Sequence, residues 1–186
     1  MSRSTPQGIL LVDGYNMIGA WPNLRETRDR DGLEAARRDL IEALLSYSAY
    51  QDFETEVVFD AQYQGTPGTR EVINRHFAIF YTDYKQTADS YIELACSRFR
   101  NDVRKFKQRL IVATSDEAQR LTVVGYGAEC MSAQKLWAEV EGATHRVRKT
   151  QRSKGRSPQR FLSSSLDPIA QQRLAQLRLG LDGEKK

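Results

Sequence analysis

The chain is poor in the residues that define several classes of protein site. Its 186 residues include only two cysteines and two histidines. Cys96 and Cys130 lie 34 residues apart with no CxxC pair and no neighbouring histidine, so we expect reduced thiols and no zinc site. His76 falls at the start of a predicted strand, away from the carboxyl ends of the strands, and His145 lies in the C-terminal tail. A mechanism based on histidine therefore has little support.

Long hydrophobic runs are also missing. No apolar run approaches the roughly 20 residues that spanning a bilayer requires. At the N-terminus one arginine precedes the apolar stretch Ile9–Val12, which runs directly into Asp13. That pattern fits neither a signal peptide nor a membrane anchor. We therefore expect a cytoplasmic protein that has no membrane partner.

Charge is distributed unevenly along the chain. Residues 142–186 hold eleven Lys or Arg and three acids, which leaves 17 basic and 21 acidic residues in the first 141. We predict a domain over residues 1–142 and a basic tail over 143–186, irregular from His145 to Arg160 and with a final helix over Leu166–Leu179. Such a tail suits a polyanion, with Arg146, Arg148 and Lys149 as candidate contacts, although a solvated tail is the alternative.

Short apolar runs with polar ends alternate with segments of helical periodicity. The predicted strands are Gly8–Asp13, Glu56–Asp60, Phe77–Thr82, Leu110–Asp116 and, more weakly, Ala128–Met131. The predicted helices are Gly32–Tyr50, Ala88–Phe99, Glu117–Val123 and Ala133–Glu141, and a loop is expected over Gln62–Arg75. This alternation predicts an α/β fold, a three-layer α/β/α sandwich around a parallel, Rossmann-like sheet.

Acids stand where the predicted strands end. Asp13, Asp60 and Asp116 each close a strand, and Asp89 opens the helix after the third strand. Ligands of parallel sheets gather at the carboxyl ends of the strands, so these acids should meet on one rim. Their repulsion calls for a cation, and an all-oxygen ligand set suits Mg²⁺ or Mn²⁺.

Single acids in this set also have structural readings. Glu93 lies four residues after Asp89, which places both carboxylates on one helix face. Asp89 could instead complement its helix dipole, and Asp116 could cap a helix with Gln119 three residues on. The prediction of a metal site over Asp13, Asp60, Asp89, Glu93 and Asp116 rests on the whole set.

Several polar residues beside the acids are candidate substrate contacts. Asn16 could orient a metal-bound water or a phosphate oxygen, and Thr114 and Ser115 could hydrogen-bond either a carboxylate or a phosphate. Lys85 could stabilise charge on a phosphate. Turn chemistry and solvation are the structural alternatives. The aromatic residues Tyr15 and Trp21 could stack on bases or pack in the core.

Four motifs in order resemble those of the YacP-like branch of the NYN nucleases. They are VDGYNMIGAW at Val12–Trp21, VVFDA at Val57–Ala61, TADSYIE at Thr87–Glu93 and VATSDEAQ at Val112–Gln119. The resemblance covers about Ile9 to Val140. It implies a PIN-like fold, a divalent metal, and catalytic acids at Asp13, Asp89 and Asp116 with Glu93 and Asn16 beside them; a direct metal contact of Asp60 stays open.

The activity that this resemblance implies is endonucleolytic cleavage of RNA. It further implies messenger RNA as the substrate and an association with the ribosome. The alternative is a non-catalytic RNA- or ribosome-binding module with the same fold. A phosphatase or nucleotide hydrolase would show a DxD nucleophile pair at a strand end or a phosphate-cradling glycine loop. The one DxD in the sequence, Asp29-Arg30-Asp31, lies outside the predicted strands, and no such glycine loop is present.

Overall fold

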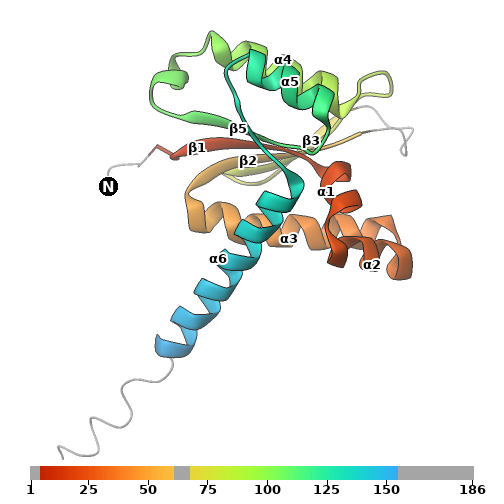
Figure 1. Ribbon diagram of the computed structural model, residues 1–186, viewed down its shortest axis with the longest axis vertical. Helices are drawn as coiled ribbons and strands as arrows, with labels where there is room; N and C mark the ends of the chain where they lie inside the picture. Colours follow the sequence, from red (N-terminus) through yellow and green to blue (C-terminus); the bar gives the residue numbers. More distant parts are fainter. Residues whose placement is uncertain (1–4, 61–67, 155–186) are drawn as a thin grey trace, which may run out of the picture. The chain divides into compact units, whose positions relative to one another are not determined.

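A six-stranded mixed sheet forms the centre of the fold (Figure 1). The computed structural model describes residues 5–60 and 68–154, and the chain divides into two units, 1–144 and 145–186. The strands are β1 (Gly8–Asp13), β2 (Phe53–Phe59), β3 (Thr69–Asn74), β4 (Phe77–Tyr81), β5 (Arg109–Ala113) and β6 (Glu129–Met131). Their order is β3-β4-β2-β1-β5-β6, with only β3 antiparallel to its neighbour. The predicted α/β sandwich is confirmed.

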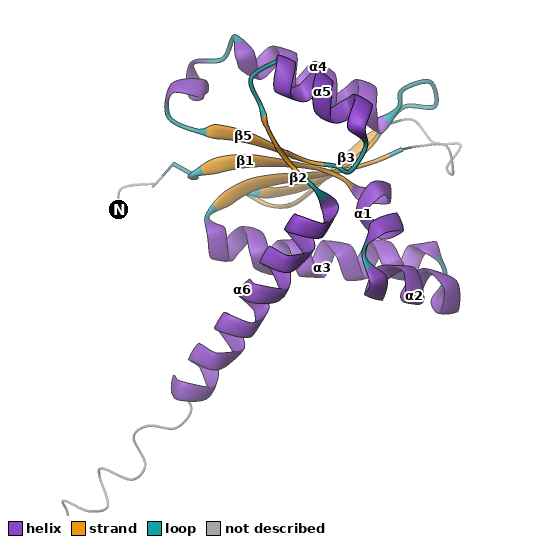
Figure 2. Cartoon of the chain, viewed as in Figure 1, coloured by secondary structure: helices purple, strands orange, loops and turns teal. Residues whose placement is uncertain are grey.

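Helices cover both faces of the sheet (Figure 2). They are α1 (Gly14–Ala20), α2 (Pro22–Asp31), α3 (Leu33–Gln51), α4 (Ala88–Arg100), α5 (Glu117–Gly125) and α6 (Ala133–Lys154), with a short 3-10 helix, η2 (Val103–Phe106). Helices α4 and α5 lie on one face, and α1 to α3 on the other. None of the described helices has the length and apolarity needed to cross a membrane.

Alternation along the strands divides the core into two layers. Leu10 and Val12 of β1 pack with the cluster formed by α1, α3 and the first part of α6, whereas Ile9 and Leu11 pack with α4 and α5. Successive side chains of a strand point to opposite faces, so a strand buried on both faces is apolar throughout. That is why β1 reads as the continuous run GILLV.

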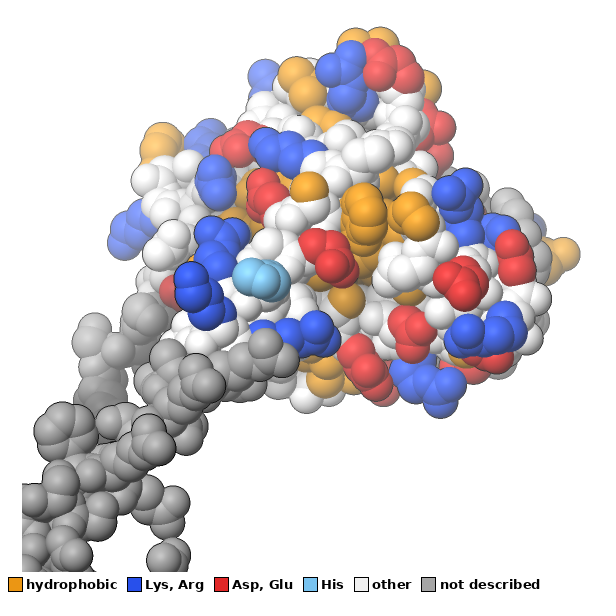
Figure 3. All heavy atoms as spheres, turned by 60° about the horizontal axis from the view of Figure 1, so that its bottom comes forward, with side chains coloured by type: hydrophobic (Ala, Val, Ile, Leu, Met, Phe, Trp, Pro, Cys, Tyr) orange, Lys and Arg blue, Asp and Glu red, His pale blue; other side chains and the backbone are white. Residues whose placement is uncertain are grey.

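Helix α2 escaped prediction because little of it is buried. Within PNLRETRDRD only Leu24 is buried, so no apolar period marks the segment. Pro22 at the first turn favours a helix start. Its surface carries solvent-accessible ion pairs, such as Arg28 with Asp29 and Arg30 with Asp31. Figure 3 shows basic and acidic side chains intermingled on this side of the molecule.

Two other expectations are corrected by the structure. The loop expected over Gln62–Arg75 contains β3, whose side chains are all exposed on an edge strand and therefore show no alternation. The arm expected to be irregular from His145 is helical to Lys154, as the continuation of α6. The predicted helix at 166–179 lies outside the described residues.

Gly14 is required by close packing against Phe59. A Cβ atom at Gly14 would lie 2.3 Å from Cε1 of Phe59. Phe59 is fully buried and its ring stacks on Tyr81, so it has little room to move. We expect Gly14→Ala to lower the free energy of unfolding by about 1–3 kcal/mol, the usual cost of overpacking. Denaturant unfolding would measure the change.

The same helix provides a matched control for that substitution. Gly19 is also in α1, and among the described residues no atom beyond its chain neighbours and the nearby helix backbone lies within 4 Å of a Cβ placed there. Gly19→Ala should be neutral or stabilise the protein by up to about 1 kcal/mol, through its higher helix propensity. Equal effects of the two substitutions would contradict the packing explanation.

Candidate active site

The register of the sheet gathers the ends of its central strands. Asp13, the last residue of β1, pairs with Val58 of β2, and Val12 pairs with Ala113 of β5. Asp60 directly follows β2, and Asp116 follows β5 after Thr114 and Ser115. Three acids that are far apart in sequence are thereby brought to one edge of the sheet.

Asp13 also begins the first helix. Its Oδ1 accepts a hydrogen bond of 3.1 Å from the backbone N–H of Asn16, which makes it the N-cap of α1. No linker separates β1 from α1, so the backbone of Asp13 is fixed by the strand before it and the helix after it.

A cleft of about 610 Å³ opens in front of this residue. Its lining includes Asp13, Asn16, Asp60 and Asp89, the last at the start of α4. Arg28 of α2 contributes a cation to the wall. Sequence reasoning missed Arg28, because the helix that carries it was not predicted.

The acids of the cleft interact electrostatically. Burial raises the pKa of Asp13 to about 6 against the lowering effect of the Asn16 N–H, and the charges of Asp89, Asp116 and Asp60 add to the rise. Partial desolvation raises the pKa of Asp89 as well, helped by Asp116, Glu93 and Asp60. All five predicted metal ligands thus belong to one electrostatic cluster.

Gln119 connects two of these acids and was not predicted as a site residue. Its Nε2 donates a hydrogen bond of 2.6 Å to Oδ1 of Asp89, and its backbone N–H donates one of 3.0 Å to Oδ1 of Asp116. The side chain is 2% exposed, and its Oε1 has no hydrogen-bond partner among the described residues. The expected helix cap at Asp116 is present, and the glutamine amide reaches across to α4.

The predicted polar contacts Asn16, Thr114 and Ser115 hold the rim together. Asn16 Oδ1 accepts from the backbone N–H of Ser115 at 2.8 Å, which ties α1 to the loop after β5. The buried Thr114 hydroxyl accepts from the Asp116 N–H at 3.1 Å. This hydrogen bond positions the backbone of Asp116.

The remaining candidates are placed as follows. Lys85 is exposed in the loop before α4, and Glu93 is half-buried one turn after Asp89. Trp21 is buried, and its Nε1 donates a hydrogen bond of 2.9 Å to the Ala133 carbonyl. Tyr15 packs edge-on against Phe59. Trp21 is thus a core residue, whereas Tyr15 is half-buried and also lines the cleft. Arg146, Arg148 and Lys149 are exposed on α6, in the second unit.

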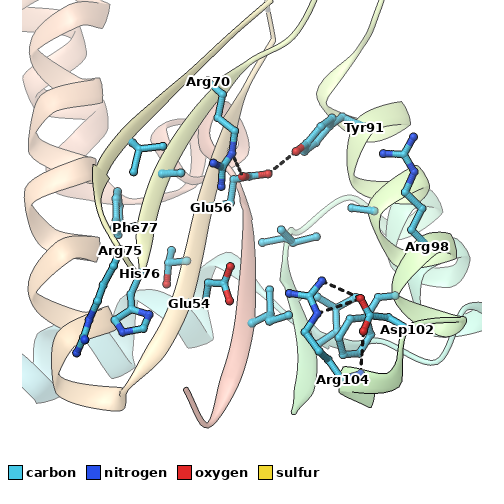
Figure 4. Close-up of a pocket in the computed structure, with 18 of the residues that line it drawn as sticks. Glu54, Glu56, Arg70, Arg75, His76, Phe77, Tyr91, Arg98, Asp102 and Arg104 are labelled. Carbon is cyan, nitrogen blue, oxygen red and sulfur yellow. Dashed lines mark hydrogen bonds and ion pairs between the residues drawn. The ribbon is translucent and has the colours of Figure 1, made fainter. Parts of the chain in front are cut away.

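A second pocket of about 280 Å³ lies over the other half of the strands, between α4 and the β3–β4 pair (Figure 4). Glu56 in this pocket already has partners for its carboxylate. Its Oε2 accepts a hydrogen bond of 2.9 Å from Nε of Arg70, and its Oε1 accepts one from the Tyr91 hydroxyl. Arg104 turns toward Asp102 in the same pocket. These acids have partners, so the rim cleft is the better candidate for a metal-dependent site.

The rim acids suit a hard divalent cation by their chemistry. Their donors are all carboxylate oxygens, and their mutual repulsion would be relieved by positive charge. Within residues 5–60 and 68–154, however, no three His, Cys, Asp or Glu side chains are grouped closely enough to hold an ion. Asp13 and Asp116 accept from helix N–H groups, and Asp89 from Gln119. Binding an ion therefore requires these side chains to turn or to share their oxygens.

The raised pKa of Asp13 predicts a pH-dependent stability in the metal-free protein. Its ordinary value of 3.8 applies to the unfolded chain, so between about pH 6 and pH 4 only the folded state binds this proton. The contribution of Asp13 to stability therefore rises as the pH falls through this window, by about 2–3 kcal/mol. Thermal melts in EDTA should show Asp13→Asn more stable than wild type at pH 8. The two proteins should converge near pH 4, and a difference that is independent of pH would contradict the assignment.

Comparison with known proteins identifies the family that this chain resembles. The model of the YacP-like NYN domain matches residues 10–179, well beyond the Val140 limit expected from the motifs. The chain is 36% identical over 139 residues to the uncharacterized protein YacP of Bacillus subtilis strain 168, which covers 75% of this chain and 78% of that protein.

The chain is also similar to solved structures of YacP. The crystal structure of a mutant of Rae1 (YacP) from Bacillus subtilis superimposes with a TM-score of 0.67 at 31% identity, covering 91% of this chain and 99% of that one. Another crystal structure of Rae1 (YacP) gives 0.62 at 31% identity, covering 96% and 99%. The chain therefore belongs to the YacP-like NYN domain family, with the nuclease-type, RNA-related function that this family implies.

Proposed function

We propose that this protein is a metal-dependent endoribonuclease that hydrolyses phosphodiester bonds of RNA, acting on messenger RNA at the ribosome. One observation carries the proposal. Asp13, Asp89 and Asp116 come from three separate elements, and Asp116 raises the pKa of each of the other two. Helix capping by Asp13 and Asp116 does not by itself require either acid to lie near Asp89, so the crowding supports a ligand that carries positive charge.

The acids have different roles in this proposal. Asp13, Asp89 and Asp116 are the catalytic set and hold Mg²⁺ or Mn²⁺, with Glu93 and Asp60 as further ligands. A divalent cation there would neutralise phosphate charge and lower the pKa of a water molecule, so that the water could lose a proton and attack phosphorus. Asn16 and Ser115 fix the rim, while Lys85 and Arg28 provide cations for a phosphate that approaches the cleft.

The decisive experiment offers the purified chain labelled RNA, labelled DNA of the same sequence, and translating ribosomes. Cleavage of RNA with Mg²⁺ or Mn²⁺, and none in EDTA, is the expected result. Either metal alone should also raise the melting temperature, because it binds the folded state. RNA binding without cleavage under every metal condition would overturn the proposal in favour of the non-catalytic binding module.

We further propose that the basic residues after the nuclease domain contact RNA phosphates. Arg146, Arg148 and Lys149 follow one another on exposed turns of α6, in a segment rich in Lys and Arg. Replacing all three with Gln should weaken RNA binding and flatten its salt dependence by about 2 in log–log slope, at about 0.7 per phosphate. Anisotropy titrations over a salt series measure this, and an unchanged slope would leave the tail a solvated appendage.

A further inference from the structure

The connection between α4 and β5 concentrates positive charge on the body of the protein. Residues 100–109 read RNDVRKFKQR, with five cations and one acid. This stands out because the first 141 residues as a whole carry more acids than bases. The cations lie on and around η2, in a part of the sequence that none of the family motifs includes.

Part of this charge has no opposing partner. Arg104 is matched by Asp102, with its Nε at 3.0 Å from Oδ2, and Figure 4 shows the two side chains facing each other. Arg109 lies 3.5 Å from Glu129, and both are more than half exposed, so the pair contributes little. Among the described residues, Arg100 and Lys107 form no ion pair.

An exposed aromatic ring stands among these cations. Phe106 is 81% exposed, and Val103, one turn earlier, is 79% exposed. The Lys105 Nζ lies 5.2 Å from the centroid of the Phe106 ring and donates a hydrogen bond of 2.7 Å to the Arg100 carbonyl. Neither apolar side chain contributes to the core, so packing does not explain them.

The ring borders a hollow that could hold a nucleotide. A groove of about 590 Å³ is lined by Phe106 and Tyr126, and Arg100, Lys105, Lys107 and Arg109 also line it, against the single acid Glu129. We call the set Arg100, Lys105, Phe106, Lys107 and Arg109 the η2 surface. Interleaved cations and aromatic rings are the combination that binds single-stranded nucleic acid, by phosphate contact and base stacking.

The η2 surface lies at the opposite end of the strands from the acids. Arg109 pairs with Gly8 at the start of β1, whereas Asp13 ends that strand. Five residues of strand rise separate these ends, about 17 Å. A ligand of the η2 surface is therefore not the phosphodiester in the cleft.

We propose that the η2 surface binds single-stranded RNA at a second position, away from the cleavage cleft. The proposal rests on the proposed action on RNA and adds where the substrate is held. An acidic protein would satisfy the cations but gives no reason for an exposed Phe106 beneath a lysine. A base has a π-face for the ring and a phosphate for the neighbouring cations, so RNA accounts for both.

The test measures binding in full-length protein carrying Asp13→Asn, so that RNA is not consumed. Fluorescent oligoribonucleotides, one short and one several times longer, are titrated by anisotropy at several salt concentrations. Phe106→Ala should weaken binding of the longer RNA about tenfold through lost stacking. Lys105→Gln with Lys107→Gln should flatten the salt slope by about 1.4, for two phosphate contacts.

A matched pair of substitutions controls for overall charge. Arg38→Gln with Lys135→Gln removes the same charge from exposed positions on α3 and α6. This variant should bind as the Asp13→Asn parent does, and all variants should keep its melting temperature, because the replaced side chains are exposed. Phe106→Leu should bind as weakly as Phe106→Ala if stacking is the cause.

The outcomes separate this proposal from the proposed function. Unchanged affinity and slope in the η2 variants would overturn it, and would be the result if the surface binds an acidic protein. An equal loss in the Arg38 and Lys135 control would overturn it too. Whether the wild-type chain cleaves RNA is scored in a separate assay, so a catalytic failure leaves the binding result readable.

Discussion

Asp13→Asn and Asp89→Asn should each abolish RNA cleavage while leaving the fold intact. Each removes a carboxylate that would hold the cation, and transition-state stabilisation of several kcal/mol corresponds to a rate loss on the order of 10³-fold or more. Asparagine caps a helix as well as aspartate does, so α1 keeps its N-cap. Relief of desolvation and repulsion should hold or raise the melting temperature at pH 7.

A control for this experiment is available on the neighbouring helix. Asp31 is an exposed acid at the end of α2, paired with Arg30 and outside the cleft. Asp31→Asn should cleave RNA at the wild-type rate. If Asp13→Asn or Asp89→Asn instead unfolded the protein, the replaced acid would be needed for the fold, and the proposed catalytic role would lose its support.

Gln119→Leu should lower cleavage about 10- to 100-fold, the usual cost of losing a residue that orients a metal ligand. The variant keeps the volume of the side chain but removes the amide that donates to Asp89. Gln119 touches no proposed reacting atom, so it is a positioning residue. Stability should change little, because Asp89 is exposed and water can replace the lost donor.

Metal titration separates this positioning role from a packing role. Isothermal titration with Mn²⁺ should show weaker binding in Gln119→Leu, whereas a packing residue would leave the affinity unchanged. Gln119→Asn retains the amide on a shorter side chain that cannot span the 2.6 Å contact, and should behave like Gln119→Leu. Wild-type metal affinity and cleavage in Gln119→Asn would exclude the positioning role.

The predictability of this fold followed the amount of apolar surface that each element buries. β1 has a strong pattern because every residue but its last is buried, which gives a continuous apolar run, and α4 because its buried residues recur at helical spacing. α2 buries one leucine and β3 none, so composition gave no sign of either. α6 continues to Lys154 through a basic stretch that also forms a helix.

The candidate site was predictable only where topology alone decides position. Strand ends in a parallel sheet meet at one edge, and that rule was enough to expect Asp13, Asp60, Asp89 and Asp116 together. Gln119 carried a visible signal, its place three residues after Asp116. Its side chain, however, bonds to a residue 30 positions earlier, and local patterns do not report such tertiary contacts.

The hydrogen bond from Ser115 to Asn16 spans 99 residues, and it bears on when the cleft first exists during protein synthesis. β1 is synthesised first and lies between β2 and β5 in the sheet. Because β5 is the fifth of the six strands along the chain, one side of β1 stays unpaired until late in translation. Domains fold as units while the ribosome extends the chain. A nascent or prematurely terminated chain that stops before residue 115 thus lacks both Asp116 and the Ser115 tie. Under the proposed function, such a chain would be inactive until most of its domain has been made.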